Sequence, residues 1–457
     1  HYILQQLIAS LTNVQFFMDL FGDSAAVVHY LRALGYRLGK IVQTGSNFGA
    51  ELRQDSPYLT SIGTETMVSD ALSVVNADYS GSSFRMSPVH IGERNFFGNY
   101  VTFPAQAKVG DNVLLATKVM VPIDGPVREN VGLLGSPAFE IPRSVERDSN
   151  FDELKQPGVL ERRLAAKNRH NLVTALIFLT IRWCQLFALL MAATLSLSLF
   201  ARYQAWAVTV DLILSPLLLQ AIAVLVERMA RGFRRLSPQF CSIYDRYFWT
   251  HERLWKLLAT PAFAGTPFRC LLWRMLGVRI GRRVFDDGCS IPEKTLVTIG
   301  DDAILNAGSI IQCHSLEDGA FKSGHTVLGA GVTLGPRTFV HYGVRIEDNA
   351  VIDTDSFLMK GEQVGAGTLW AGNPAVQTGT VTVAPAPLPA NLEAALVTTA
   401  PVPNPIETPL TEPTTPDAET MLARINALEQ ALAELRTATR PDAGELLLAG
   451  DSTRSEK

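Results

Sequence analysis

The sequence has few cysteines and no excess of charge of either sign. Its 457 residues include five cysteines, an odd number without a C-x-x-C pair, which argues against a disulfide framework and against a zinc site. We therefore expect no metal site and a reducing compartment. Because 40 Lys and Arg stand against 44 Asp and Glu, with no basic stripe, nucleic acid is not an expected partner.

A start signal and an adenylation motif are also missing. The chain begins at His1 in a helical pattern, with no initiator Met and no signal-peptide pattern, so we expect a fragment of a longer polypeptide. Without an adenylation motif, the chain should not activate amino acids by itself. Its length allows two or three domains.

An apolar residue recurs at every sixth position in two stretches. The second stretch contains Ile299, Leu305 and Ile311 and then runs without a break from Leu328 to Trp370. A period of six fits neither a helix nor a flat strand, but a parallel β-helix needs it when each short face turns one aliphatic residue inward. The first stretch contains Ile62, Val68 and Val74, then every sixth residue from Ile91 to Leu133, with Val127 among them.

The two stretches are copies of one module, since their matching positions lie 237 residues apart. Upstream, the segment Arg32 to Gly35 matches the segment Arg274 to Gly277 at a slightly larger offset. Each copy is therefore a helical segment followed by a β-helix. Identities at the main offset include Gly92 with Gly329, Asp111-Asn112 with Asp348-Asn349, and Pro137-Ala138 with Pro374-Ala375.

Two long apolar runs, residues 172–200 and 206–226, lie between the copies. Each can cross a bilayer, which takes about 20 helical residues; the alternative is a buried helical hairpin in a soluble core. Arg182 indicates either that the first span begins near Trp183 or that this side chain faces protein. Arginines flank both runs, whereas the connecting loop has only Arg202, which predicts an integral protein of the cytoplasmic membrane with its soluble domains facing the cytoplasm.

The six-residue repeat is interrupted once in each copy, and the second interruption holds the densest cluster of reactive side chains. A histidine can take a proton from an attacking amine, and a neighbouring carboxylate can fix its tautomer. We predict His314 as this base, with Asp318 or Glu317 orienting it. Lys322 and His325 in the same loop are expected substrate contacts.

Three further residues lie outside this role. His341 is expected to line a groove for the pantetheine arm and so to contact substrate, with a purely structural role as the alternative. His251 is interpreted as a helix surface residue rather than a site residue. Cys313 is interpreted as a small buried residue rather than a nucleophile.

The stretch from His314 to Trp370-Ala371-Gly372-Asn373-Pro374-Ala375 resembles hexapeptide-repeat acetyltransferases of the maltose and galactoside type. The resemblance implies a left-handed β-helix, a catalytic role for His314, and substrate contacts near the pantetheine arm for Trp370 and Asn373. In the first copy Asn76-Ala77-Asp78 replaces Cys313-His314-Ser315. We therefore expect that copy either to have no catalytic activity or to have another role.

A second resemblance covers nearly all of the chain up to residue 377. The segments that carry it include Leu276-Gly277-Val278-Arg279-Ile280-Gly281, Gln312-Cys313-His314-Ser315-Leu316-Glu317-Asp318 and Asp355-Ser356-Phe357-Leu358-Met359-Lys360-Gly361-Glu362. They resemble the terminal region of ε-poly-lysine-synthetase-type non-ribosomal peptide synthetases. This implies a membrane-anchored condensation region, which joins a carrier-bound aminoacyl thioester to the amine of a free amino acid.

The same resemblance implies the partners. Upstream adenylation and carrier domains would supply the phosphopantetheine-linked thioester, so this chain would bind no cofactor of its own, and a third β-helix module would precede His1. The three modules would form an intramolecular pseudo-trimer, in which the first copy contributes groove walls and the second supplies His314. The alternatives are a free-standing membrane-associated acyl-CoA acyltransferase and a non-catalytic scaffold or product conduit.

The expected fold is mainly β with membrane helices: two tandem left-handed parallel β-helix domains joined by a transmembrane helical hairpin. The expected boundaries are an opening helical segment 1–34, the first β-helix module 35–150, the hairpin 172–226, an amphipathic helical segment 227–276, the second β-helix module 277–377, a disordered Pro/Ala/Thr-rich linker 378–416, a short helix 417–440 and a disordered tail 441–457.

Overall fold

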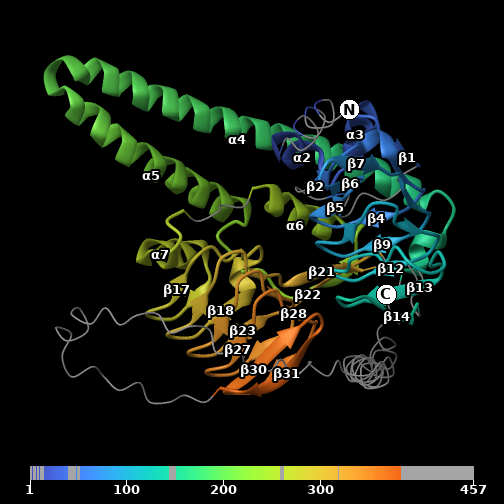
Figure 1. The fold of residues 1–457 in the computed structure, drawn as a ribbon. Coiled ribbons are helices and arrows are strands. Elements are labelled where there is room, and N and C mark those ends of the chain that lie inside the picture. The colour runs from blue at the N-terminus through green and yellow to red at the C-terminus, as the bar shows by residue number, and fades with distance from the viewer. Residues whose placement is uncertain are drawn as a thin grey trace, which may run out of the picture. The chain divides into compact units, whose positions relative to one another are not determined.

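The computed structural model describes residues 15–39, 52–143, 151–257, 262–317 and 319–381, together with Ile3, Leu7, Ser10 and Phe48. Within these residues two β-rich bodies are joined by a long helical hairpin (Figure 1). The predicted short helix and tail lie outside the described residues, as does most of the linker. Its first residues belong instead to a strand, β31 (Ala375–Thr380).

The second β-rich body is a parallel β-helix with three sheets. Leu328 pairs with Ile346 and Ile346 with Val364, so a full coil takes 18 residues. All predicted inward residues from Leu328 to Trp370 are buried, which confirms the six-residue repeat as one inward side chain per face. The strands of the coil are β16 (Arg279–Ile280), β17 (Phe285–Asp286), β18 (Val297–Ile299), β19 (Ile304–Leu305), β20 (Ile310–Ile311), β23 (Thr326–Leu328), β24 (Thr333–Leu334), β25 (Phe339–Val340), β26 (Arg345–Ile346), β27 (Val351–Ile352), β28 (Phe357–Leu358), β29 (Gln363–Val364) and β30 (Thr368–Gly372), which pairs antiparallel with β31.

The first β-rich body repeats this architecture, with one departure from the predicted pattern. Val127 is 50% exposed, because a turn at 123–126 places Arg128 opposite Val109 in the ladder. The other predicted inward residues of this copy are buried. Its strands are β1 (Arg37–Leu38), β2 (Leu52–Gln54), β3 (Thr60–Ile62), β4 (Met67–Val68), β5 (Leu72–Val74), β8 (Val89–Ile91), β9 (Phe96–Phe97), β10 (Thr102–Phe103), β11 (Lys108–Val109), β12 (Leu114–Leu115), β13 (Val131–Leu134) and the antiparallel β14 (Phe139–Pro142).

Each interruption of the repeat is a two-stranded antiparallel hairpin. In the first copy β6 (Ala77–Ser80) and β7 (Ser83–Met86) form it and leave Tyr79 and Phe84 exposed. In the second copy β21 (His314–Glu317) and β22 (Ala320–Ser323) form it, and β15 (Phe240–Ser242) adds a third strand. Phe321 of this hairpin is buried against Phe248, so the second interruption is packed into the protein.

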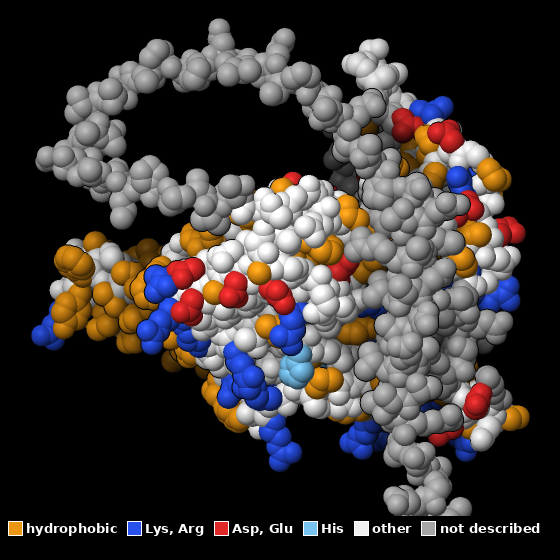
Figure 2. All heavy atoms as spheres, turned by 90° about the horizontal axis from the view of Figure 1, so that it is seen from below, with side chains coloured by type: hydrophobic (Ala, Val, Ile, Leu, Met, Phe, Trp, Pro, Cys, Tyr) orange, Lys and Arg blue, Asp and Glu red, His pale blue; other side chains and the backbone are white. Residues whose placement is uncertain are grey.

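The segment between the copies forms two helices, α4 (Val159–Tyr203) and α5 (Ala205–Ala230). Both are long and apolar enough to cross a membrane, and only 6% of the most apolar window of each is buried. The alternative of a buried hairpin in a soluble core is therefore wrong. Figure 2 shows hydrophobic side chains over the projecting hairpin (left), with Lys and Arg beside its base.

The remaining helices pack against the coils, the hairpin or both. A glycine with positive φ ends α3 and α7, at Gly35 (112°) and Gly277 (100°), as is common where a helix gives way to a turn. Each of these two helices then leads directly into its coil. The bounds are α2 (Gln15–Phe21), α3 (Ala26–Ala33), α6 (Arg246–Lys256), α7 (Pro267–Leu276) and the 3-10 turns η1 (Pro57–Leu59), η2 (Asp152–Lys155) and η3 (Lys294–Leu296).

The two coils meet along a seam of polar contacts. Nδ2 of Asn99 donates to Oε1 of Gln312 at 2.7 Å. Further along, Nζ of Lys118 lies 2.8 Å from Oδ1 of Asp355. The amide of Ser136 donates to the carbonyl of Asn373 at 3.1 Å. The seam therefore runs from the interruption of the second copy to the last turn of its coil.

Candidate active site

His314 is held by a carboxylate that the sequence analysis did not select. Its Nδ1 lies 2.8 Å from Oε1 of Glu293, which directly precedes η3. Nε1 of Trp255 donates to the same oxygen at 2.8 Å, and the amide of Cys313 donates to Oε2 at 3.0 Å. The Glu293 side chain is 1% exposed, so the hydrogen bonds fix it in a single orientation.

These contacts determine the ionisation of Glu293 and which ring nitrogen of His314 carries a hydrogen. Burial opposes ionisation of Glu293, but the interaction with His314 and the hydrogen bonds from His251 and His314 hold its pKa well below the ordinary carboxyl value. An ionised carboxylate only accepts hydrogen bonds, so Nδ1 of His314 carries a hydrogen. In the neutral ring Nε2 then keeps a lone pair and can accept a proton.

The predicted orienting residue Glu317 has a different partner. Its Oε2 lies 2.7 Å from Nζ of Lys360 and 3.9 Å from Nζ of Lys322. Against the effect of burial, these two cations hold the pKa of Glu317 down at about 2. Side chains alternate along a strand, which puts His314 and Glu317 on opposite faces of β21. The prediction that Glu317 orients His314 is wrong, and Asp318 lies outside the described residues.

Helix α6 supplies the other walls of the His314 pocket. His251 and Trp255 are four residues apart and share one helix face. The Trp255 ring stacks on His314 with centroids 4.4 Å apart and planes 27° apart. His251 is 4% exposed, and its Nε2 lies 3.4 Å from Oε1 of Glu293, so its interpretation as a helix surface residue is wrong.

The other predicted site residues lie away from this pocket. Lys322 stands over the Phe240 ring at 5.9 Å, and Nδ1 of His325 lies 3.4 Å from the Leu296 carbonyl. Burial lowers the pKa of His341 to about 3, so its ring is neutral, and the Tyr342 amide donates to its Nδ1 at 3.0 Å.

Trp370 and Asn373 occupy structural positions. The Trp370 ring is 6% exposed in the core of the second coil, which contradicts its predicted substrate contact. Nδ2 of Asn373 donates to the Lys118 carbonyl at 3.3 Å, on the seam between the copies. Cys313 is fully buried as interpreted, and burial raises the pKa of its thiol.

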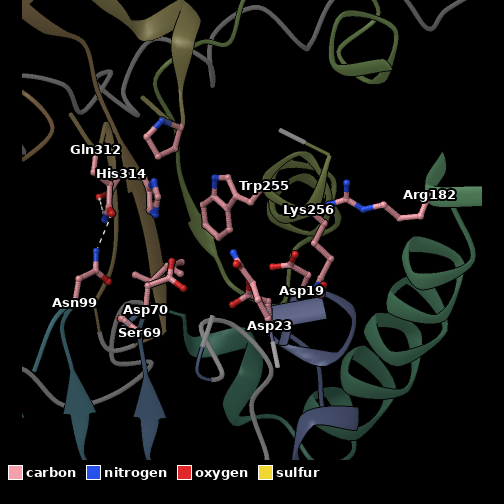
Figure 3. A pocket seen from close by; sticks show the side chains of 13 residues that line it. Asp19, Asp23, Ser69, Asp70, Asn99, Arg182, Trp255, Lys256, Gln312 and His314 are labelled. Atoms are coloured by element: carbon pink, nitrogen blue, oxygen red, sulfur yellow. Dashed lines mark hydrogen bonds between the residues drawn. The ribbon is translucent and has the colours of Figure 1, made fainter. Parts of the chain in front are cut away.

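His314 and Trp255 face a cavity of about 340 Å³. Figure 3 shows Trp255 between His314 and a group formed by Asp19, Asp23 and Lys256. Both copies contribute to the walls, as do both α2 and the hairpin. The lining residues are Gln15, Asp19, Asp23, Ser69, Asp70, Asn99, Arg182, Trp255, Lys256, Pro292, Gln312, His314 and Leu316.

The far side of the cavity carries charges of both signs. Nζ of Lys256 donates to the carbonyls of Asp19 and Gly22, each at 2.6 Å, and burial lowers the pKa of this amine. Burial raises the pKa of both Asp19 and Asp23. Arg182 of α4 lines the cavity and is exposed, and its guanidinium lies 4.9 Å from the ring of Phe178 in the same helix.

Sequence reasoning missed Glu293 because it searched only the loop of His314. The signal was the comparison of the two copies, since the position of Glu293 holds Ser56 in the first copy and the position of His314 holds Ala77. Both members of the pair are thus missing from the first copy. Within the described part of the chain, no group of three or more His, Cys, Asp or Glu side chains is arranged to hold a metal ion.

The second coil follows a six-residue repeat and holds a buried His–Glu pair at the interruption of that repeat. No protein-family model matches the chain. Over 377 residues it is 26% identical to the δ-poly-L-ornithine synthetase of Acinetobacter baumannii (strain AB307-0294), an alignment that covers 80% of this chain. The chain spans 27% of that relative's length.

Solved structures with similar segments include acetyltransferases and an N-acyltransferase from Bacillus cereus. A hexapeptide-repeat acetyltransferase from Vibrio cholerae is 15% identical and matches 27% of this chain and 84% of its own, with a TM-score of 0.23. A maltose O-acetyltransferase from Clostridium difficile 630 is 16% identical and matches 32% of this chain and 94% of its own, also at 0.23. At these scores the assignment of the coils rests on their strand pairing.

Proposed function

We propose that this chain is the terminal condensation region of a non-ribosomal peptide synthetase that makes a poly-amino acid. It would join a carrier-bound aminoacyl thioester to the amine of a free amino acid. The observation that carries the proposal is the His314–Glu293 pair facing a cavity with charges of both signs. The similarity to a poly-ornithine synthetase supports the same chemistry.

In the proposed reaction His314 is the general base. Its Nε2 takes a proton from the amine as the nitrogen attacks the thioester carbonyl, and the new C–N bond forms while the C–S bond breaks. The proton then passes from His314 to the departing carrier thiolate, which restores the neutral ring. Glu293 stabilises the transient imidazolium through Nδ1, so the proton transfer needs no rearrangement of the site.

The charged side of the cavity suits the second substrate. A free amino acid carries a carboxylate, for which Arg182 and Lys256 are the complementary cations. Its cationic groups would face Asp19 and Asp23. The cavity volume of about 340 Å³ falls in the range of small-molecule sites. Binding at this wall would leave the reacting amine on the side of His314.

The partners and the orientation belong to the same proposal. Adenylation and carrier domains elsewhere in the polypeptide would supply the phosphopantetheine-linked thioester, and a third β-helix module would complete a pseudo-trimer. The hairpin would anchor the assembly in the cytoplasmic membrane with both ends on the cytoplasmic side. Arginines at both outer ends of the hairpin support this orientation.

The test supplies the full chain, in membranes, with a loaded carrier domain and the free amino acid, and quantifies the amide product. His314→Ala should lower the rate by about 10²-fold or more. The matched control is His90→Ala, which removes an exposed histidine bonded to Ser61 in the first copy. An unchanged rate in His314→Ala would favour a scaffold or conduit, and transfer from acyl-CoA but not from the carrier would favour a free-standing acyltransferase.

A further inference from the structure

Helix α7 presents an apolar face to the outside of the molecule. Phe268, Leu271 and Met275 are 64%, 52% and 49% exposed. Their spacing of three and four residues places them on one side of the helix. The opposite side is buried against the second coil and consists of Arg269, Cys270, Trp273 and Leu276.

The first copy provides an internal comparison, because α3 is the counterpart of α7. The two helices bury the same positions, since Val27, Val28 and Leu31 of α3 correspond to Arg269, Cys270 and Trp273. The outer positions differ. Where α7 has Phe268, Leu271 and Met275, α3 has Ala26, His29 and Ala33. The module therefore folds without an apolar outer face, and the face on α7 requires its own explanation.

Helix α7 packs against the end of α5, the second helix of the hairpin. Nη2 of Arg231, just past the end of α5, donates to the Leu276 carbonyl at 2.7 Å, and Nη2 of Arg235 donates to the Gly277 carbonyl at 3.3 Å. Val224 of α5 shares a buried core with Trp273. Figure 1 shows α7 beside the lower end of α5. The helix that carries the apolar face thus packs against the end of a helix that can cross a membrane.

We propose that α7 lies in the interfacial layer of the bilayer that holds the hairpin. Phe268, Leu271 and Met275 would enter the acyl-chain boundary, and the exposed Arg274 of the same helix would contact anionic headgroups. An apolar helix face with flanking basic residues binds membrane surfaces in this way. The contacts with α5 hold α7 at the depth where that surface begins.

This placement also links the bilayer to the candidate active site. On the buried side of α7, Nε of Arg269 lies 2.7 Å from Oδ2 of Asp286. Nζ of Lys294 stands 5.8 Å from the Trp273 ring and 2.8 Å from Oε2 of Glu227 in α5. Lys294 directly follows Glu293 in the chain. The membrane would therefore fix the chain segment that positions Glu293, the carboxylate partner of His314.

The experiment places an environment-sensitive fluorophore on the full chain in liposomes. Leu271→Cys carries the probe, and His29→Cys at the matching position of α3 is the control, both in a Cys184→Ser background that removes the exposed native thiol. Brominated lipid should quench the probe at 271 strongly and aqueous iodide weakly, and the reverse should hold at 29. Iodide quenching at 271 equal to that at 29 would overturn the proposal, as would protection of 271 from both quenchers, which would mean that protein covers the face.

A second variant tests the face itself. Phe268→Ala, Leu271→His and Met275→Ala together give α7 the outer residues of α3, which the first copy accommodates. A probe at Thr266→Cys should then move from lipid quenching to iodide quenching, while the hairpin still resists carbonate extraction. Unchanged lipid quenching in this variant would contradict a role for the three side chains.

Discussion

Nδ1 of His314 lies 2.8 Å from Oε1 of Glu293, and the first copy lacks both residues. There Ala77 takes the place of the histidine, and its amide donates to Oδ2 of Asp55 at 3.3 Å. The Asn76 amide also donates to Oδ2 of Asp55, as the Cys313 amide donates to Oε2 of Glu293, so the first copy keeps a carboxylate that accepts from this strand. What the first copy lacks is the histidine, so its carboxylate has no ring at position 77 to orient.

Glu293→Gln should lower amide formation by about tenfold or more, because the amide no longer stabilises a charged His314 ring. Glu317→Gln should leave the rate within about threefold, since Glu317 forms an ion pair with Lys360 on the other face of β21. The measurement is the single-turnover rate with a loaded carrier. If Glu317→Gln were the more damaging change, the assignment of Glu293 would be wrong.

Arg182→Gln should raise the KM for the free amino acid by about tenfold or more with little change in kcat, because a charge-assisted contact to its carboxylate is lost. Arg202→Gln is the matched control, since this arginine of the same helix stands over Tyr203 and does not line the cavity. The methyl ester of the amino acid should show a smaller difference between wild type and Arg182→Gln. Equal effects on acid and ester would count against carboxylate recognition.

The orientation of the hairpin can be measured at the turn between α4 and α5. With Cys184 replaced by serine, a cysteine at Gln204 should react with a membrane-impermeant maleimide only from the outer face of the cytoplasmic membrane. A cysteine at Ser83, on the hairpin of the first coil, should react only after lysis. Labelling of position 204 from the cytoplasm would reverse the proposed topology.

The sequence predicted the coils because their signal is local. Each inward residue stands six positions from the next and packs against other inward residues of the same coil. The six-residue period alone was therefore enough to predict the coil. Glu293 was not predictable from spacing, because one turn of the coil separates it from His314 and packing brings the two together. The roles of His251 and Trp255 depend on how α6 docks against that coil, which no pattern within α6 specifies.

The seam between the coils yields a charge-reversal prediction. Lys118→Asp should destabilise the protein by about 1 kcal/mol or more, because two carboxylates would then meet and the carbonyls of Arg337 and Asp355 would lose their donor. Adding Asp355→Lys should recover part of the loss. Thermal unfolding of the single and double variants in detergent measures both effects, and additive losses would mean that the pair does not interact.

Lys118 and Asp355 are also the same position of the repeated module, 237 residues apart. A residue that contacts the equivalent residue of the other copy lies next to the symmetry axis that relates the two copies. In an assembly of identical chains such a position must hold one residue type, and a lysine there would face a lysine. Fusing the copies into one polypeptide removed that restriction. Each side could then mutate alone, and opposite charges now meet at a place where self-association would have forced like charges together.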